Sequence, residues 1–226
     1  MFTPNPSTAS QRLVEFFGLY LLSRLLGSPL TATFAALFQK AQAELEQADA
    51  AERAANRTVV HLTAVRDTAV EALDEAVGSL ELKVLDAVSR NREADEYKVL
   101  FPQGLMGIVD SPLADRIELV RTLVTSAAKG RPEFVAFAKK LSAALAAAEK
   151  AMTDLQLAEN AHTVAQTEEF VARDAWIRAY RATYGMLVTA FPGNRKKVER
   201  FFRSTKKRVE ALPKGPSTPE TPAQAA

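Results

Sequence analysis

The chain holds two histidines, His61 and His162, and no cysteine. Glu159 and His162 form a Glu-x-x-His, which on a helix places both side chains on one face, as in di-iron helical bundles. Such a centre needs a second Glu-x-x-His and two further inward glutamates. Because Thr58 stands at the matching place before His61, we expect a solvated histidine near a helix end and no metal site.

Other catalytic patterns are missing from the sequence. It contains no Gly-rich phosphate loop, no nucleophile elbow and no His-Glu-x-x-His. Neighbouring carboxylates occur at Asp74-Glu75 and Glu168-Glu169. Adjacent side chains on a helix point in different directions, so these carboxylates do not form catalytic pairs. We expect them to lie on solvated faces of their helices. We therefore expect a protein that is not an enzyme and that carries no cofactor.

A basic segment at residues 194–212 is the clearest functional signal. Asn194 can cap a helix whose apolar face holds Val198, Phe201, Phe202, Val209 and Leu212. Eight cations lie on its other faces: Arg195, Lys196, Lys197, Arg200, Arg203, Lys206, Lys207 and Arg208. Against Glu199 and Glu210 they give a net charge of +6, which leaves −4 for the remainder of a chain whose total is +2.

Several partners fit a helix of this kind. It could neutralise nucleic-acid phosphates, lie on an anionic membrane or dock on an acidic protein. In another interpretation, Phe201 and Phe202 fasten the segment to a helical bundle while its Lys and Arg residues face water.

Composition sets the elements that must carry these residues. The 226 residues are 47% hydrophobic and 25% charged with only nine glycines, which favours a folded, all-α protein. The absence of cysteine suits a reducing cytoplasm, and the N-terminus lacks the pattern of a secretory signal. The most apolar stretch, residues 13–26, carries Glu15 and Arg24 and is too short to span a bilayer, so we expect a buried core helix.

An internal repeat organises the chain. Gly27-Ser-Pro29 recurs as Gly130-Arg-Pro132, a shift of 103 residues that also places Val14-Glu-Phe-Phe on Ile117-Glu-Leu-Val. Arg66-Asp67 aligns with Arg173-Asp174 at a shift of 107, which implies a slip of about one helical turn. Each half then ends on Phe-Pro, at Phe101 and at Phe191.

The two Gly-x-Pro corners should each end a helix, with Gly in a left-handed cap and Pro opening the next segment. No Gly or Pro occurs in residues 30–77 or 133–184. We expect each tract to fold back as a hairpin, at residues 56–58 and 160–163, where Asn can end one helix and Thr can begin the next. A single unbroken long helix is the alternative.

The closing helix of the second half carries an apolar stripe that should lie in the core. It consists of Phe170, Ile177, Tyr180, Tyr184, Leu187 and Phe191, and Trp176 borders it. Arg66-Asp67 and Arg173-Asp174 should form ion pairs with neighbouring helices.

These patterns together predict an elongated antiparallel helical bundle of two pseudo-repeated halves plus a C-terminal basic helix. The expected parts are an N-terminal tail (1–10), a first repeat (11–104), an irregular connector (105–113), a second repeat (114–193), the basic helix (194–212) and a disordered tail (213–226). The arrangement resembles uncharacterised bacterial tandem helical-hairpin proteins of unknown function, a resemblance that supports the fold and implies no activity.

We therefore expect a non-enzymatic scaffold or adaptor that recognises another macromolecule, through a protein partner or by self-association. The alternatives are electrostatic binding of nucleic acid through residues 194–212 and peripheral binding to an anionic membrane. No small-molecule substrate is inferred.

Overall fold

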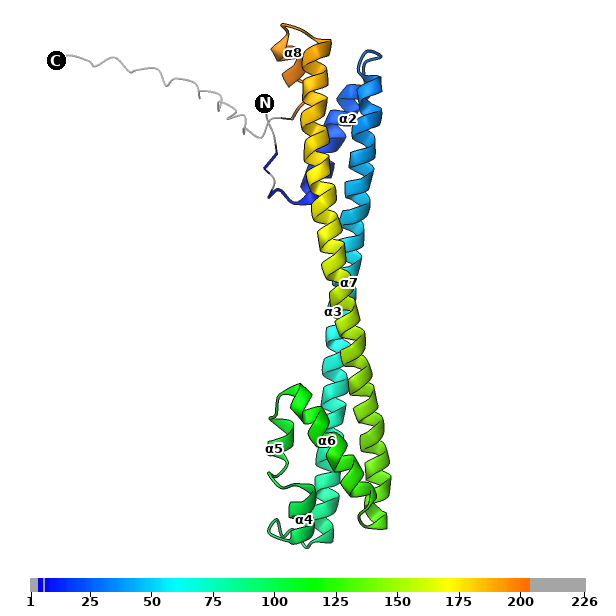
Figure 1. Ribbon diagram of the computed structural model, residues 1–226, viewed down its shortest axis with the longest axis vertical. Coiled ribbons are helices and arrows are strands. Elements are labelled where there is room, and N and C mark those ends of the chain that lie inside the picture. Colours follow the sequence, from blue (N-terminus) through cyan, green and yellow to red (C-terminus); the bar gives the residue numbers. More distant parts are fainter. Residues whose placement is uncertain (1–3, 6, 204–226) are drawn as a thin grey trace, which may run out of the picture. The chain divides into compact units, whose positions relative to one another are not determined.

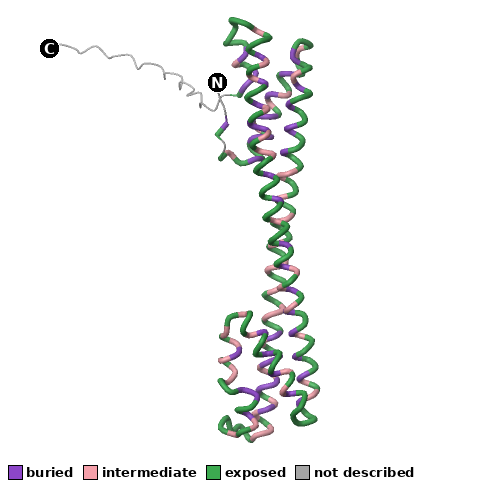
Figure 2. The backbone as a smooth tube through the Cα atoms, viewed as in Figure 1, coloured by how far each residue is buried: buried purple, intermediate pink, exposed green. Residues whose placement is uncertain are grey.

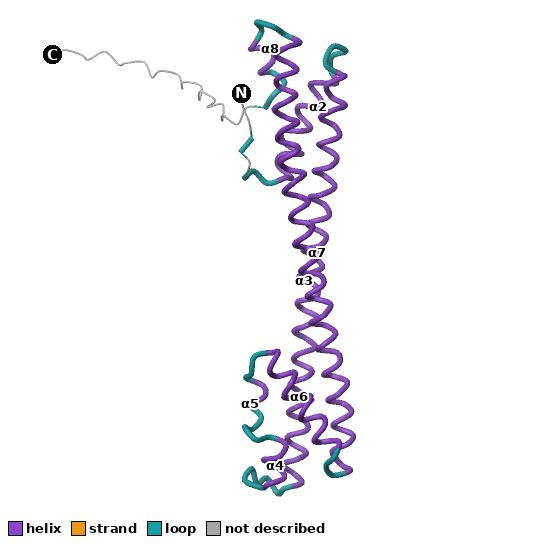
Figure 3. Tube along the Cα trace, viewed as in Figure 1, coloured by secondary structure: helices purple, strands orange, loops and turns teal. Residues whose placement is uncertain are grey.

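The computed structural model describes residues 4–5 and 7–203. Every regular element in this part is a helix, and no strand occurs within it (Figure 3), which confirms the all-α fold class. The helices are α1 (Ser10–Arg12), the π-helix η1 (Leu13–Gly18), α2 (Leu19–Leu26), α3 (Ala32–Ala87), α4 (Asp95–Leu100), α5 (Met106–Val109), α6 (Leu113–Ala128), α7 (Pro132–Ala190) and α8 (Arg195–Glu199). The predicted disordered tail lies outside the described residues.

The two tracts without Gly or Pro are single continuous helices, α3 and α7. The expected hairpins at residues 56–58 and 160–163 are therefore wrong, and the alternative of an unbroken helix is confirmed. Thr58 and Thr163 do not cap new helices. Their hydroxyls donate to the carbonyl oxygens four residues earlier, of Ala54 at 3.1 Å and Glu159 at 3.0 Å, as threonines inside a helix do.

The chain divides into two compact units, each with an antiparallel pair of segments from α3 and α7 (Figure 1). Among the described residues, unit 1 combines those up to residue 46 with those from residue 173 onward, and unit 2 comprises residues 47–172. Each unit thus joins the beginning of one sequence half to the end of the other.

The predicted repeat is visible in the pattern of burial (Figure 2). Buried residues just before and at the start of α3 recur in α7 at a shift of 103: Thr31, Ala35, Phe38, Gln42 and Leu45 correspond to Phe134, Ala138, Leu141, Leu145 and Ala148. The same shift relates the helix ends, where Leu73, Val77, Leu80 and Val84 correspond to Trp176, Tyr180, Thr183 and Leu187. The expected slip to 107 is therefore wrong for the long helices, which keep one register throughout.

The helix ends differ from expectation in two ways. Gly27 closes α2 in the right-handed region, at φ −70°, and the positive-φ glycines of the described part are Gly104 and Gly193. The left-handed caps expected at the Gly-x-Pro corners are therefore wrong. The two Phe-Pro pairs are not equivalent either, because Phe101 follows α4 whereas Phe191 directly follows α7.

The predicted connector, residues 105–113, is more regular than expected. It contains α5 and the first residue of α6. Ile108 is its buried apolar anchor.

Unit 1 is built around aromatic rings. Trp176 and Tyr180 are fully buried and stacked with their centroids 5.0 Å apart. The ring of Phe38 lies 5.4 Å from that of Trp176, and that of Phe202 lies 5.1 Å from Tyr180. The predicted apolar stripe is confirmed here. Its first member is not, because Phe170, in unit 2, is 65% exposed.

A buried glutamine ties three elements of unit 1 together. The Gln42 side chain donates from Nε2 to the carbonyl oxygen of Val14 at 3.2 Å and accepts from Trp176 Nε1 at 2.7 Å. Val14 belongs to η1, where its carbonyl accepts from Leu19 N, five residues on. A Cβ at Gly18 would lie 2.0 Å from Gln42 Oε1, so glycine at this position gives the amide its space.

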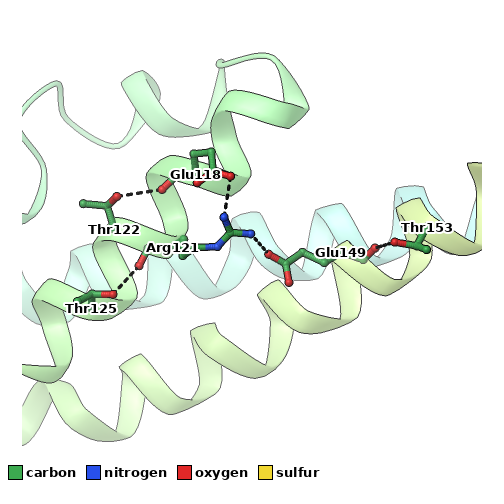
Figure 4. A network of polar contacts seen from close by, with 6 residues as sticks. All are labelled: Glu118, Arg121, Thr122, Thr125, Glu149 and Thr153. Atoms are coloured by element: carbon green, nitrogen blue, oxygen red, sulfur yellow. Dashed lines mark hydrogen bonds and ion pairs between the residues drawn. The ribbon is translucent and has the colours of Figure 1, made fainter.

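Unit 2 packs the end of α3 against α6 and the beginning of α7. Arg121 of α6 donates to Glu118 Oε1 at 2.7 Å and to Glu149 Oε1 of α7 at 2.5 Å (Figure 4), and these carboxylates raise its pKa. On α3, the buried Glu81 accepts a hydrogen bond from Tyr97 of α4 at 2.7 Å. Burial and this carboxylate raise the pKa of Tyr97 to about 12.

Removing the Gln42 amide should lower the unfolding free energy of unit 1. The variant Gln42→Leu leaves Trp176 Nε1 buried without its acceptor, which should cost about 1–3 kcal/mol of unfolding free energy. Trp176 is the only tryptophan in the sequence, so urea unfolding followed by tryptophan fluorescence reports on unit 1. The exposed neighbour Gln39→Leu is the control, and equal midpoints for the two variants would contradict the role given to Gln42.

Candidate functional site

The Glu-x-x-His motif does not form a shared site. His162 points toward α3, where its Nε2 lies 3.0 Å from Glu52 Oε1, and both side chains are half-buried. Glu159 and His61 are exposed. Within the part of the chain that the structure describes, no three His, Asp or Glu side chains cluster closely enough to hold a metal ion. The expectation that His162 is solvated is wrong, because it forms a contact between helices.

The neighbouring carboxylates are also not uniformly solvated. Glu75 and Glu168 are exposed as expected, but Glu169 is buried. Asp74 is half-buried and pairs with Arg116 of α6 at 2.7 Å. Its burial raises the Asp74 pKa against the opposing effect of Arg116. Asp74 therefore fastens α6 to α3.

The ion pairs of Asp67 and Asp174 in the two Arg-Asp motifs lie within one helix, Asp174 pairing with Arg178 of α7 at 2.7 Å, so the expectation of pairs with neighbouring helices is wrong for both aspartates. Arg66 binds its own neighbour Asp67 at 2.6 Å, on the same helix, so the expectation is wrong for this residue. Arg173 reaches α1, where its Nε donates to Ser10 Oγ at 3.0 Å.

Two hollows in unit 2 are poor candidates for a substrate site. A cavity of about 110 Å³ lies between α4, α5 and α6 and is lined by Val99, Ile108 and Leu119 among others. Small-molecule sites usually need several hundred Å³, so this cavity is too small. A more open hollow contains Glu81, but that carboxylate already accepts from Tyr97 and lies 3.5 Å from Arg92.

The basic segment begins as predicted and then departs from a long helix. Asn194 caps α8, since its Oδ1 accepts from Lys197 N at 3.1 Å. The helix covers only Arg195–Glu199 and ends in a turn over residues 200–202. Residues 204–212, with Lys206, Lys207, Arg208, Val209 and Leu212, lie outside the described residues.

Apolar side chains fasten this segment to unit 1. Val198, Phe201 and Phe202 are buried, and Phe202 packs on Tyr180 and Tyr184. Tyr20 of α2 donates its hydroxyl to the Arg200 carbonyl oxygen at 3.3 Å. The interpretation that Phe201 and Phe202 attach the segment to the bundle is therefore confirmed for the described part.

Three of the five described cations of the segment make contacts within unit 1. Arg195 Nε pairs with Glu199 at 2.8 Å, and these contacts raise the Arg195 pKa. Lys197 Nζ lies 3.9 Å from the centroid of the Phe191 ring, and Arg203 Cζ lies 3.7 Å from that of Phe16. Such cation–π contacts hold the cation against the protein surface. Lys197 and Arg203 are therefore less available to bind phosphates than the sequence suggested.

A second surface was not foreseen from the sequence. In unit 2, residues 47–72 of α3 lie beside residues 149–172 of α7. We call these two segments the helix pair. Its inward positions recur every three or four residues, as in a coiled coil. On α3 they are Ala48, Glu52, Ala55, Val59, Leu62 and Arg66, and on α7 they are Ala151, Leu155, Ala158, His162, Ala165 and Glu169. Most of them are alanine or polar, so the helix pair buries little apolar surface of its own.

The helix pair instead carries large apolar side chains on its outside. Leu157, Val164 and Val171 follow one another at seven-residue intervals on α7 and are 63%, 57% and 58% exposed. Seven residues are close to two helical turns, so the three lie on one flank of the helix, together with the exposed Ala161. We call Leu157, Ala161, Val164 and Val171 the apolar flank.

The neighbouring flank of α3 continues this surface. The seven-residue pattern of an antiparallel pair places Ala51, Ala54, Thr58 and Val65 of α3 on the same side as the apolar flank. All four are exposed. The sequence signal for this surface is a second seven-residue pattern beside the buried one. This second pattern can be recognised only when α7 is known to be one continuous helix.

Comparison of the chain with protein-family models, with curated proteins and with solved structures finds no match. Among the described residues, no helix combines the length and the apolar character needed to cross a bilayer.

Truncating an anchor of the basic segment tests its attachment. Phe202→Ala removes a buried ring and should lower the unfolding free energy of unit 1 by about 3–5 kcal/mol. Arg195→Ala, at an exposed side chain of the same segment, should have little effect. Urea unfolding followed by Trp176 fluorescence measures both. Equal stability of Phe202→Ala and the wild type would show that the segment is not packed on unit 1.

Proposed function

We propose that this chain is a non-enzymatic helical scaffold or adaptor that recognises another macromolecule. The observation that carries the proposal is the apolar flank, a regular row of Leu157, Val164 and Val171 that no other part of the described chain covers. Exposed apolar side chains that line up on one side of a helix are a feature of surfaces where proteins associate.

The composition of the helix pair supports this function. A pair of helices that needed only its own stability would place its leucines and valines inward, because burial of such side chains is the main stabilising term. Here alanines such as Ala158 and Ala165 lie inside, while Leu157 and Val164 lie outside. Side chains at these exposed places contribute to stability only when something covers them.

The ionisable groups of unit 2 favour a structural role over catalysis. Glu52 is engaged with His162, Asp74 with Arg116, and Glu81 with Tyr97. Each pair links two helices, which is the arrangement expected of structural hydrogen bonds and ion pairs. A cytoplasmic location is part of the proposal, since the sequence has no cysteine to oxidise.

The test is a comparison of affinity-tagged full-length chains expressed in their native cells. The variant Leu157→Gln/Val164→Gln/Val171→Gln should lose its co-purifying partner at least tenfold, because three apolar contacts are replaced by solvated amides. Phe170→Gln is the matched control, since Phe170 is equally exposed but lies on another side of α7. Equal recovery of every partner by the triple variant and the wild type would reject the apolar flank as the recognition surface.

Binding of nucleic acid or of an anionic membrane through the basic segment is the second candidate, supported by the separation of charge along the sequence. Affinity for a DNA duplex should then fall steeply as salt rises from 50 to 200 mM. The variant Lys206→Glu/Lys207→Glu/Arg208→Glu should abolish it, whereas Lys139→Glu/Lys140→Glu, at exposed lysines of α7, should not. Fluorescence anisotropy measures the duplex, and co-sedimentation with phosphatidylserine vesicles measures the membrane. A response independent of salt and of these cations would reject this candidate.

A further inference from the structure

Unit 1 and unit 2 carry opposite net charge. The described residues of unit 1 hold eleven lysines and arginines against five carboxylates, whereas residues 47–172 of unit 2 hold fourteen against twenty. Four of the five carboxylates of unit 1 lie outside residues 16–43 and 175–203, so this part has nine cations and a single carboxylate, Glu199. A net charge of this sign attracts anionic partners and raises their local concentration. An anionic partner should therefore approach unit 1.

Cations of this unit gather beside η1 and α2, although they come from both ends of the sequence. Arg12 and Arg203 lie over the Phe16 ring, with their Cζ atoms 5.6 and 3.7 Å from its centroid. Four residues later, Tyr20 has Arg203 Cζ 5.9 Å from its ring and donates its hydroxyl to the Arg200 carbonyl oxygen. The turn after α8 thus lies along α2 and adds its cations to those of the helix.

Exposed, unpaired cations lie close to this contact. Arg24 comes four residues after Tyr20 on α2, Lys196 lies in α8, and Arg200 directly follows α8. All three are exposed, and none of them forms an ion pair with another described residue. An anion can therefore bind them without first displacing a carboxylate.

The exposed side of α2 also carries leucines. Leu19 and Leu26 are 51% and 60% exposed and lie seven residues apart, close to two helical turns, so they share one edge of the helix. Helical geometry places this edge opposite the buried Leu21, and it places Tyr20 and Arg24 along the other exposed edge. We call this surface the α2 face and define it by Leu19, Tyr20, Ser23, Arg24 and Leu26.

A partner that matches the α2 face must offer negative charge and an apolar layer side by side. Nucleic acid supplies phosphates, but it has no apolar layer that would cover Leu19 and Leu26. An anionic bilayer supplies both, because leucine and tyrosine side chains can enter the boundary between headgroups and acyl chains while arginines stay at the phosphates. The apolar flank does not match a bilayer of this kind, since its unit has a net negative charge.

We propose that the α2 face docks unit 1 on the surface of an anionic membrane. Leu19 and Leu26 enter the interface, and Arg24 binds the headgroups together with Lys196 and Arg200 of the basic segment. This inference rests on the second candidate function and deepens it, because it chooses the membrane over nucleic acid and assigns the contact to folded residues of unit 1. Peripheral docking needs no helix that crosses the bilayer.

Co-sedimentation of the full chain with vesicles tests the leucines. Vesicles of phosphatidylcholine with about one third phosphatidylserine should bind the wild type, and phosphatidylcholine alone should bind it about tenfold more weakly. Leu19→Gln/Leu26→Gln should lower the partition coefficient about tenfold, because two apolar side chains no longer leave water. The matched control is Leu82→Gln/Val99→Gln, at similarly exposed apolar residues of unit 2.

Both double variants change exposed side chains, and far-UV circular dichroism should confirm that they keep their helices. Equal binding of the two variants, or equal binding of the wild type to charged and neutral vesicles, would overturn the proposal.

Charge reversal tests the cations in the same assay. Arg24→Glu/Arg200→Glu should weaken binding to the charged vesicles about tenfold or more, since each cation near the surface attracts anionic lipid. Lys139→Glu/Lys140→Glu, at exposed lysines of unit 2, should bind like the wild type. Binding that responds to Lys206→Glu/Lys207→Glu/Arg208→Glu but not to Arg24→Glu/Arg200→Glu would overturn the α2 face as the contact.

A fluorescent label tests whether the α2 face enters the bilayer. The sequence has no cysteine, so Leu26→Cys can be labelled selectively with a nitrobenzoxadiazole dye, whose emission rises in an apolar environment. Charged vesicles should raise the emission at this position and leave it unchanged at the control, Leu82→Cys. Equal responses at the two positions would contradict insertion of the α2 face.

The outcomes separate this inference from the proposed functions. A wild type that binds the DNA duplex but no vesicle would overturn the membrane as the partner and leave nucleic acid as the second candidate. The co-purification experiment is independent of both results, because Leu157, Val164 and Val171 lie in unit 2. Its failure would reject the apolar flank without changing the vesicle binding expected of unit 1.

Discussion

The structure depends on the pairing of two very long helices, which must bury a seven-residue pattern along their shared side. Two helices alone cannot enclose a large side chain, so aromatic rings in such a pair would stay partly exposed to solvent. The sequence places its bulkiest core residues where a third helix covers them. In unit 1, Tyr180 packs on Phe17 of η1 and Trp176 shares Gln42 with the Val14 carbonyl of η1. In unit 2, Phe134 and Leu141 lie in one core with residues of α6. Alanine dominates in between.

The polar inward residues of the helix pair fit this constraint. Glu52 and His162 contact one another from opposite helices at 3.0 Å. Groups of this kind contribute little net stability, but a shift of one helix against the other would leave both without a partner. An alanine-rich seam is otherwise tolerant of sliding, because its layers are nearly identical. We infer that the Glu52–His162 contact helps to fix the register of α3 against α7.

Much of this architecture follows from the sequence, and the exceptions have physical causes. The helical class, the 103-residue repeat, the aromatic core around Tyr180 and the cap at Asn194 could all be predicted, because each depends on local spacing. The hairpins could not be excluded, since a helix of such length is stabilised by an antiparallel partner more than a hundred residues away. For the same reason Phe170 was wrongly placed in the core. It continues a local apolar pattern, but the partner helix determines which face is buried.

The candidate sites also differ in whether the sequence or the tertiary contacts reveal them. The basic segment is visible in composition, but the contacts of Lys197 with Phe191 and of Arg203 with Phe16 depend on how the chain ends fold back on unit 1. The apolar flank is the reverse case. Its residues look like ordinary core positions until the continuity of α7 shows that the inward side is already occupied by others.

The repeat also shows how one architecture is held by two different interactions. At the 103-residue shift, Gly18, Gln42 and Glu46 of unit 1 correspond to Arg121, Leu145 and Glu149 of unit 2. In unit 2, Arg121 crosses from α6 to Glu149 on α7. In unit 1 the corresponding position is glycine, and Gln42 fills the space to bind both Glu46 and the Val14 carbonyl of η1. The glutamate is common to both units, but one short helix is fastened by an exposed ion pair and the other by a buried amide. Because Arg121 is exposed and Gln42 is buried, salt should screen the first link far more than the second.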